Sequence, residues 1–539
     1  MKIIRCFTSA GFLLAFSACV LAQLDPTTGI VAGSNVSAEN GAADVTLGDV
    51  TFVNHGLVGV GRIDANSLDA WGESLGSVSG LQLGNWTRTG PHAYTGSFYI
   101  LPDRGYNSAP NFSNYAGRIQ KIDFSFRPEK GASFKGPSVP QDQFTFSYDA
   151  AGSFKFTVET ADGVSATTGL VPDSATLLGG KLVPFVTISN GTAAFPPGAG
   201  AVVVDKMSID AEALVLLPDG SGYFGDEYGA NIYHFNAAKQ IDGVITPPPA
   251  VQPHLPFGNL RFSSEVSNVN GRRGNQGMEA IALSPDGKTL FGLMQSATIQ
   301  DSGSGNQGRR QTRLLAYDIS TDVIPATHAA EYVLTLPILN DAGVGAPNRT
   351  AAQSEIIALD NSRFLVLSRD GNGKGTATAL APVFKSVLLV DLAGATDISK
   401  LNGGAFDLEG GDITPAGTTL AAGIAPVRWV EAVNLLNSLQ LSKFGLNLKS
   451  GATSDANSLS EKWEGMALAP VKEPGKGNQF FLFVANDNDF VSTATKMRSL
   501  DGSTVTTVDA VQENGVPVKN DTMFLVYRVT INGLTRTSE

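Results

Sequence analysis

Alternating apolar and polar residues form many short segments along this chain, and long patterns with helical spacing are nearly absent. In five places an apolar strand is followed, after a turn, by a second apolar strand that ends in a polar pair. The first strands are marked by Ser79, Glu212, Glu279, Glu355 and Glu464, and the second strands end in Asp103-Arg104, Asp226-Glu227, Gln295-Ser296, Arg369-Asp370 and Asn486-Asp487. A strand pair that recurs at intervals of tens of residues is typical of a β-propeller or a solenoid.

The turns between these strands favour hairpins. Asp219-Gly220 and Asp286-Gly287 each lie between the two apolar runs of one copy, and Asp-Gly in that place is a strong hairpin signal. The copies are unevenly spaced, which argues against a solenoid. We therefore predict an all-β fold, a β-propeller of six or seven four-stranded blades with long loops, in which the first and last strands of the chain share one blade.

Two regions interrupt the repeat. Residues 127–205 carry alternating aromatic residues and a patch rich in Gly, Pro and Ser, and we interpret them as an insertion or a degenerate blade. Residues 400–460 begin with a loop-like stretch and include residues 428–441, whose apolar side chains fall on one helical face. We predict a single domain over residues 23–539, with a short helical insertion in the second of these regions.

The N-terminus has the features of a secretory signal peptide. Lys2 and Arg5 precede an apolar stretch that is too short to span a bilayer, and Val-Leu-Ala at residues 20–22 predicts cleavage after residue 22. Both cysteines, Cys6 and Cys19, fall in this segment, so the mature chain is expected to have no disulfide. We expect an extracellular monomer. Six N-x-S/T sequons make it a candidate glycoprotein, at Asn35, Asn85, Asn111, Asn190, Asn348 and Asn520.

The net charge of the mature chain limits the classes of ligand that it can bind. Without Lys2 and Arg5 the 38 basic residues become 36, against 50 acidic residues, which gives a formal charge of −14. This excess of acid argues against a basic face for nucleic acid and favours cations as ligands. No later segment is apolar and long enough to span a membrane. The five histidines show no metal-binding spacing, and we interpret them as structural.

The repeat predicts that its glutamates meet. In a propeller the first strand of every blade lines the central channel, which would place Glu212, Glu279, Glu355 and Glu464 at matching depth. Carboxylates brought together in a poorly solvated channel repel one another, so they must take up protons, pair with arginine or bind a cation. Oxygen ligands without cysteine favour Ca²⁺ or Mg²⁺ over zinc. The structural alternative is that each glutamate bonds to the backbone or to an arginine of its own blade.

The ends of the second strands supply further charged residues at the same rim. Arg104 and Arg369 can grip a phosphate or a carboxylate, or neutralise the glutamates. Arg272 and Arg273 lie in a Gly-rich loop, which suits anion capture, although a solvated loop is the alternative. We take these two arginines and Tyr228 as candidate substrate-binding residues. The candidate metal ligands are Asp103, Glu212, Asp226, Glu227, Glu355, Asp370, Asp487 and Asp489.

At these residues the chain resembles the secreted phytase-like family, which is described by the esterase-like activity of phytase. The matching phrases lie between residues 59 and 490 and include Leu101-Pro-Asp-Arg-Gly105, Gly225-Asp-Glu-Tyr-Gly229, Met278-Glu-Ala-Ile-Ala-Leu-Ser-Pro-Asp-Gly-Lys288, Ser354-Glu-Ile-Ile-Ala-Leu359 and Ala485-Asn-Asp-Asn-Asp-Phe490. The resemblance implies a β-propeller that hydrolyses phosphate esters with bound Ca²⁺. The chain departs from propeller phytases in lacking a dense Lys/Arg cluster for an inositol polyphosphate, which leaves its substrate open.

The leading hypothesis is a secreted, metal-dependent hydrolase that acts on a small-molecule phosphate or carboxylate ester. Glu279 or Glu464 would be the general base, and Arg104 or Arg369 would stabilise the developing negative charge. Two alternatives remain. One is a non-catalytic secreted propeller that binds a sugar, peptide or cell-wall component through exposed aromatic residues such as Tyr106, Tyr115 and Trp86. The other is a metal-dependent propeller of the lactonase type.

Overall fold

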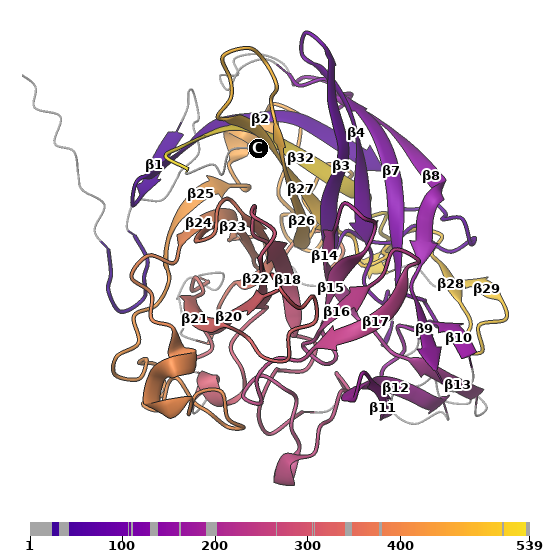
Figure 1. Ribbon diagram of the computed structural model, residues 1–539. Helices are drawn as coiled ribbons and strands as arrows, with labels where there is room; N and C mark the ends of the chain where they lie inside the picture. The colour runs from indigo at the N-terminus through magenta and orange to yellow at the C-terminus, as the bar shows by residue number, and fades with distance from the viewer. Residues whose placement is uncertain are drawn as a thin grey trace, which may run out of the picture.

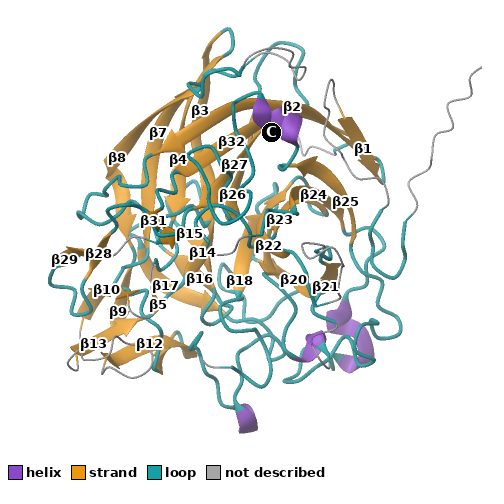
Figure 2. Cartoon of the chain, turned by 180° about the vertical axis from the view of Figure 1, so that it is seen from behind, coloured by secondary structure: helices purple, strands orange, loops and turns teal. Residues whose placement is uncertain are grey.

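Most of the chain folds into β-strands. The computed structural model describes residues 24–31, 43–105, 107–108, 111–129, 138–160, 163–189, 202–265, 267–303, 306, 308–339, 348–376, 380–508 and 511–534. The predicted signal peptide lies outside these residues. Sequentially adjacent strands pair antiparallel, as Figures 1 and 2 show from opposite sides. The chain is therefore all-β, as the sequence predicts.

Five sheets stand around a common axis. Their first strands contact one another in the closed order β3, β14, β18, β22, β26 and back to β3. The first sheet contains β3 (Gly80–Gly90), β4 (Ala93–Leu101), β7 (Arg118–Phe126) and β8 (Phe144–Lys155). The second contains β14 (Ala211–Leu216), β15 (Gly222–Asp226), β16 (Ile232–Phe235) and β17 (Gln240–Ile245), extended by β9 (Thr157–Thr160) and β10 (Gly163–Ala166).

The other three sheets continue the ring in chain order. The third contains β18 (Met278–Leu283), β19 (Thr289–Met294), β20 (Gln311–Asp318) and β21 (Ala330–Thr335). The fourth contains β22 (Ala352–Ala358), β23 (Arg363–Arg369), β24 (Lys385–Asp391) and β25 (Arg428–Asn434). The fifth contains β26 (Lys462–Pro470), β27 (Gln479–Asp487), β32 (Thr522–Asn532), β2 (Val50–Ile63) and β1 (Ala43–Leu47). The result is a propeller-like arrangement.

The fifth sheet joins the two ends of the chain. Strand β2 pairs antiparallel with β32, with Thr51 opposite Asn532 and Ile63 opposite Thr522. The prediction that the first and last strands share one sheet is thus confirmed. The ring is closed in this way, because the N-terminal strands complete the sheet that the C-terminal strands begin.

The count of six or seven blades is not confirmed, because the ring has five sheets in the part of the chain that the structure describes. Residues 127–205 do not add a sheet to the ring. Their strand β8 completes the first sheet, and β9 and β10 extend the second. The strands β11 (Ser174–Leu178), β12 (Lys181–Ser189) and β13 (Val202–Met207) form a separate sheet of three.

The predicted helix over residues 428–441 is wrong in its first half. Residues Arg428–Asn434 are strand β25, which pairs with β24, and only Ser438–Ser442 form the helix α1. Trp429, Val430 and Val433 are buried, and such aromatic and β-branched residues suit a sheet with both faces covered. The 3₁₀ turns are η1 (Pro256–Gly258), η2 (Gln300–Ser302) and η4 (Ile398–Gly403). The short strands are β5 (Asn107–Ser108), β6 (Asn111–Phe112), β28 (Lys496–Arg498), β29 (Val505–Thr507), β30 (Gln512–Glu513) and β31 (Val516–Pro517).

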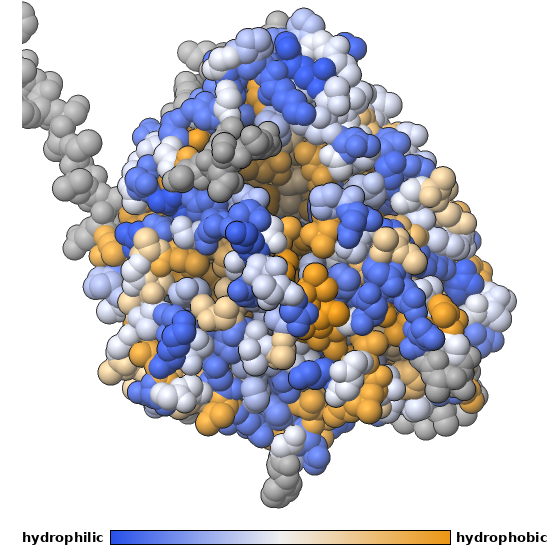
Figure 3. All heavy atoms as spheres, in the orientation of Figure 1, coloured by the Kyte–Doolittle hydropathy of each residue, from blue (hydrophilic) through white to orange (hydrophobic). Residues whose placement is uncertain are grey.

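Apolar side chains fill the spaces between neighbouring sheets. Between the first and fifth sheets, Trp86 stacks on Tyr94 at a centroid distance of 4.9 Å, and Phe481 meets Tyr94 edge-on at 5.1 Å. Small residues allow close approach elsewhere: a Cβ at Gly225 would lie 2.5 Å from the carbonyl oxygen of Met278 in the next sheet. Outside these interfaces, polar side chains cover much of the face seen in Figure 3. The packing holds the five inner strands in fixed positions around the axis.

Candidate functional site

A β-bulge near the start of the inner strand aims one side chain at the axis in four of the five sheets. The strand pairing skips one residue in β14, β18, β22 and β26, and the skipped residues are Glu212, Glu279, Ser354 and Glu464. A bulge re-aims a side chain and is common beside active sites. The three glutamates present carboxylate oxygens within 4.8 Å of one another. Sequence positions far apart thus meet in one cluster.

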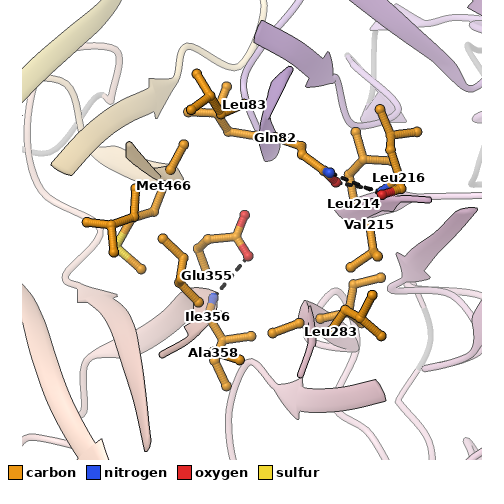
Figure 4. A pocket seen from close by; sticks show the side chains of 16 residues that line it. Gln82, Leu83, Leu214, Val215, Leu216, Leu283, Glu355, Ile356, Ala358 and Met466 are labelled. Atoms are coloured by element: carbon orange, nitrogen blue, oxygen red, sulfur yellow. Dashed lines mark hydrogen bonds between the residues drawn. The ribbon is translucent and has the colours of Figure 1, made fainter. Parts of the chain in front are cut away.

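Glu355 does not join this cluster. In β22 the bulge falls on Ser354, so Glu355 is in the regular ladder opposite Leu367, one position out of phase with the other glutamates. Its side chain lines a second hollow of about 270 Å³ at the apolar part of the channel, among residues such as Leu83 and Leu283 (Figure 4). There it accepts a hydrogen bond from the Ile356 backbone N–H at 2.9 Å. The expectation that Glu355 shares the depth of the other three is wrong.

A second ring of polar residues follows from the same register. In the second sheet, Ala213 is the first residue after the bulge and pairs with Gly225. Glu227 lies two positions beyond Gly225, and the corresponding position in every other second strand is also polar. The members of this ring are Asp103, Glu227, Gln295, Arg369 and Asp487. The sequence identifies the strand ends but not which residue of each polar pair faces the axis, because that depends on the bulge.

The three glutamates and the members of the second ring other than Asp487 line a cavity of about 420 Å³. Its wall holds seven carboxylates and three cationic side chains, so carboxylates are in excess by four. The carboxylates belong to Asp103, Asp210, Glu212, Glu227, Glu279, Glu464 and Asp489, and the cations to Arg104, Arg369 and Lys462. An enclosed site with this composition attracts cations rather than free anions.

Each cation of the wall already has a carboxylate partner. Arg369 donates to Glu464 in a buried pair, with side chains 9% and 3% exposed. Lys462 Nζ lies 2.6 Å from Asp489 Oδ1. Arg104 Nε lies 3.1 Å from Asp210 Oδ2, and its other nitrogens donate to Tyr228, Ser264 and Asn275 at 2.7–3.0 Å. Lys462 Nζ also lies 3.5 Å from Asp487 Oδ2, so three cations stand against a larger number of carboxylates.

Burial and mutual repulsion act on the carboxylates of this site. Burial is the largest cause that raises the pKa of Asp103, Glu212 and Glu279 well above the usual range, and neighbouring carboxylates add to it. The same two causes raise the pKa of Asp487, with burial the larger. Burial also raises the pKa of Glu227 to about 8. Such a site either holds protons at neutral pH or holds a cation that replaces them.

Two buried carboxylate oxygens at this site, one on Glu279 and one on Asp487, accept no hydrogen bond. Glu279 Oε1 accepts from Gln295 Nε2 at 3.0 Å, whereas its buried Oε2 has no hydrogen-bond partner. Asp487 Oδ1 accepts from the Asp489 backbone N–H at 2.6 Å, whereas the buried Oδ2 accepts no hydrogen bond. Asp103 belongs to two further oxygen groups, one with Asp210 and Glu212 and one with Asp487 and Asp489. An all-oxygen donor set with orphaned buried oxygens fits Ca²⁺ or Mg²⁺.

Five other residues singled out from the sequence have structural contacts and do not line the cavity. Asp226 accepts backbone N–H groups of Asp210 and Gly229. Asp370 accepts from Lys385 Nζ at 2.8 Å and from the backbone of the loop after β23. Arg272 is fully buried and donates to backbone carbonyls, including that of Tyr228. Tyr228 itself bonds to Arg104 and to the Gly169 carbonyl. Arg273 donates to Asn306.

Sequence reasoning missed two charged residues of the cavity. Asp210 immediately precedes β14, and Lys462 opens β26 two positions before Glu464. Both lie next to a repeated glutamate, so proximity to the repeat was an available signal. Two of the aromatic residues expected to bind a ligand are buried instead, since Trp86 is 8% exposed and Tyr115 is 1% exposed, and Tyr106 lies outside the described residues. Tyr115 stacks on the Arg118 guanidinium, which makes it part of the interior.

Comparisons with known proteins identify the family of the chain. The family model described as "Phytase-like: Esterase-like activity of phytase" matches residues 74–490. An "Uncharacterized secreted protein" of Arthroderma benhamiae is 31% identical over 472 residues, which cover 83% of this chain and 88% of that protein. A luciferin-regenerating enzyme structure has a TM-score of 0.26 at 12% identity, covering 88% of this chain and 95% of its own. Hsv2 of Kluyvelomyces marxianus has a TM-score of 0.21 at 10% identity, covering 58% and 93%. TM-scores this low establish no common fold.

Proposed function

The chain belongs to the phytase-like family described by esterase-like activity of phytase, and from this premise we propose that it is a secreted, Ca²⁺-dependent hydrolase of phosphate or other esters, built on a five-bladed β-propeller. The substrate is a small molecule that enters the cavity between the two rings. One observation carries the proposal: seven carboxylates face three cations that are already paired, and a buried Glu279 oxygen has no hydrogen-bond partner. A divalent cation satisfies both the charge and the oxygen.

The proposed ligands are the carboxylates of Glu212, Glu279 and Glu464, whose oxygens already lie within 4.8 Å of one another. Asp103 and Asp487 offer oxygens at the outer ring. A bound divalent cation would polarise the ester oxygen and acidify a water molecule. It would also supply the positive charge for an anionic substrate that the paired arginines do not supply by themselves. This explains how a cavity with excess carboxylate can receive a phosphate ester.

The base follows from what remains. Glu464 pairs with Arg369 and Glu279 groups with Glu212, which supports cation binding for these two glutamates and leads us to propose Glu227 as the base in their place. Glu227 lines the cavity, is 3% exposed and has a pKa raised to about 8 by burial. A carboxylate with a raised pKa near the working pH is suited to accept a proton from water. Arg104 and Arg369 both line the same cavity and are the two arginines available to face developing negative charge.

Secretion is part of this proposal. The predicted signal peptide and the relative described as secreted both support it. In the residues that the structure describes, every helix is too short or too polar to cross a membrane. Among the sequons that the structure describes, Asn520 is 3% exposed and donates to Ser460 at 3.0 Å, so a glycan there would disrupt the fold.

A substrate panel tests the proposal. Aryl phosphate, inositol phosphate, aryl acetate and lactone are offered to the purified protein in EGTA, and again with Ca²⁺ or Mg²⁺. We expect turnover of at least one ester with Ca²⁺, lost in EGTA. Glu227→Gln should lower kcat by about 10²–10⁴-fold, the usual contribution of a general base. Glu355→Gln is the matched control, because it removes a buried carboxylate outside the cluster. Equal turnover in EGTA and Ca²⁺, or no turnover of any ester, would contradict the proposal.

A further inference from the structure

A second group of ionisable side chains lies at the outer edge of the third sheet, at the opposite end of the strand order from the inner strand β18. His328 precedes β21, the last strand of that sheet, and Glu331 lies in β21. Asp407 comes from the segment that follows η4 and packs against β21 (Figure 1). The imidazole of His328 and the carboxylates of Glu331 and Asp407 present atoms within 4.8 Å of one another.

The spacing of these atoms is that of ligands around a small cation. His328 Nε2 lies 3.3 Å from Asp407 Oδ2 and 3.9 Å from Glu331 Oε2. With metal–ligand bonds of about 2.0–2.2 Å, neighbouring ligand atoms in a tetrahedral zinc site stand ~3.3–3.5 Å apart. A hydrogen-bonded histidine–carboxylate pair in this same chain is much tighter, since His234 Nδ1 lies 2.5 Å from Asp242 Oδ1.

The atoms that converge on this point lack hydrogen-bond partners. Glu331 is completely buried, and its Oε2 accepts no hydrogen bond. Asp407 Oδ1 and the nearby Tyr317 hydroxyl are likewise buried without a hydrogen bond, and His328 Nε2 has only the 3.3 Å contact with Asp407 Oδ2. An unpartnered buried polar atom costs about 1–3 kcal/mol. Several such atoms pointing to one place indicate that a ligand satisfies them together.

The charged groups around this point are predominantly negative. Arg313 donates to Asp301 and, through Nη1, to Glu331 Oε1 at 2.9 Å. These three groups with Asp407 carry one positive and three negative charges when ionised, so the cluster is short of two positive charges when His328 is neutral. A divalent cation supplies them without adding protons. Because Arg313 occupies only Oε1 of Glu331, the second oxygen stays available.

We infer that His328, Glu331 and Asp407 form a Zn²⁺ site. One imidazole nitrogen and two carboxylates are ligands of the kind that zinc accepts, and histidine disfavours Ca²⁺. The site would bind Asp407, on the segment after η4, to the edge of the third sheet. The structure describes no cysteine in this chain, because both cysteines fall in the first 22 residues. A metal cross-link would hold this long segment where a disulfide cannot.

The test uses the full-length secreted chain, stripped with chelator and then saturated with Ca²⁺ so that the axial cavity is occupied. Zn²⁺ alone is then titrated calorimetrically, and thermal melting is followed with and without Zn²⁺. We expect one Zn²⁺ per chain and a higher melting temperature in its presence. His328→Gln and Asp407→Asn should each weaken Zn²⁺ binding at least 100-fold. His234→Gln is the control, because His234 bonds to Asp242 and belongs to no such group.

The Zn²⁺ affinities of the variants show whether His328, Glu331 and Asp407 form the site. Loss of the Zn²⁺ site in both variants, with the control unchanged, supports the assignment, and Co²⁺ in the site should then show absorption typical of tetrahedral coordination. Zn²⁺ binding that is equal in wild type and His328→Gln, or undetectable in wild type, would overturn it. In that case the group is an imidazolium with two carboxylates that share a proton. Asp407→Asn keeps the test valid if His328→Gln does not fold, since the Asp407 side chain is 23% exposed.

Discussion

Replacing Arg369 by methionine removes the cation that pairs with Glu464 in the glutamate cluster at the axis. The Arg369 guanidinium and the Glu464 carboxylate are 9% and 3% exposed, so Glu464 would be left buried beside Glu212 and Glu279. Removing one partner of a buried ion pair costs about 3–5 kcal/mol. The entropy of unfolding is about 2.1 cal/mol/K per residue, or about 1 kcal/mol/K for roughly 500 residues, so the melting temperature should fall by ~3–5 °C.

The assay is thermal melting in chelator and in saturating Ca²⁺. We expect Ca²⁺ to raise the melting temperature of Arg369→Met more than that of wild type, because the cation replaces the missing positive charge. Arg363→Met is the control: Arg363 begins the same strand, β23, and pairs with Asp360 and with the exposed Asp49, away from the axial site, where surface pairs are worth about 1 kcal/mol each or less. Equal melting temperatures for the two variants in chelator, or equal Ca²⁺ shifts in Arg369→Met and wild type, would refute the reasoning.

Three further predictions concern stability. In chelator the melting temperature should fall as pH rises from 6 to 8. Burial raises the pKa of Glu227 and Glu461 to about 8, so over this range the folded chain loses protons that the unfolded chain has already released. A melting temperature that rises over that range would argue against this assignment. Gly225→Ala should cost about 1–3 kcal/mol, since its Cβ would meet the Met278 carbonyl oxygen at 2.5 Å; an unchanged melting temperature would show that the sheets can separate freely. Trp86→Ala should cost about 3–5 kcal/mol through the cavity left between the first and fifth sheets, and a loss below about 1 kcal/mol in denaturant titration would speak against tight packing there.

The sequence pattern anticipates the strand pairs and the meeting of their polar ends, because both follow from the two-residue period of a strand. It does not anticipate the bulge. Glu355 was aligned with Glu279 by its neighbours, yet in β22 the skipped residue is Ser354. One skipped residue turns every later side chain to the other face. Spacing alone therefore assigned Glu355 to the wrong part of the channel.

Other differences arise from tertiary contacts that no local pattern encodes. Arg272 looked like an anion-binding residue in a Gly-rich loop, but its guanidinium is consumed by backbone carbonyls that only the folded loop brings together. Residues 428–434 have helical spacing, yet pairing with β24 makes them a strand. His328 lacked a metal-binding spacing because Asp407 lies 79 residues further on in the sequence. Side chains that meet through packing are invisible to motif searches.

Calorimetric titration of Ca²⁺ into Glu279→Gln and Glu355→Gln tests most directly whether the carboxylates at the axis bind Ca²⁺. Both substitutions neutralise a buried glutamate of an inner strand, but only Glu279 belongs to the carboxylate group at the axis. The account predicts that Glu355→Gln binds Ca²⁺ as wild type does and that Glu279→Gln loses the tight site. Equal affinity in the two variants, or no heat of Ca²⁺ binding in wild type, would contradict it.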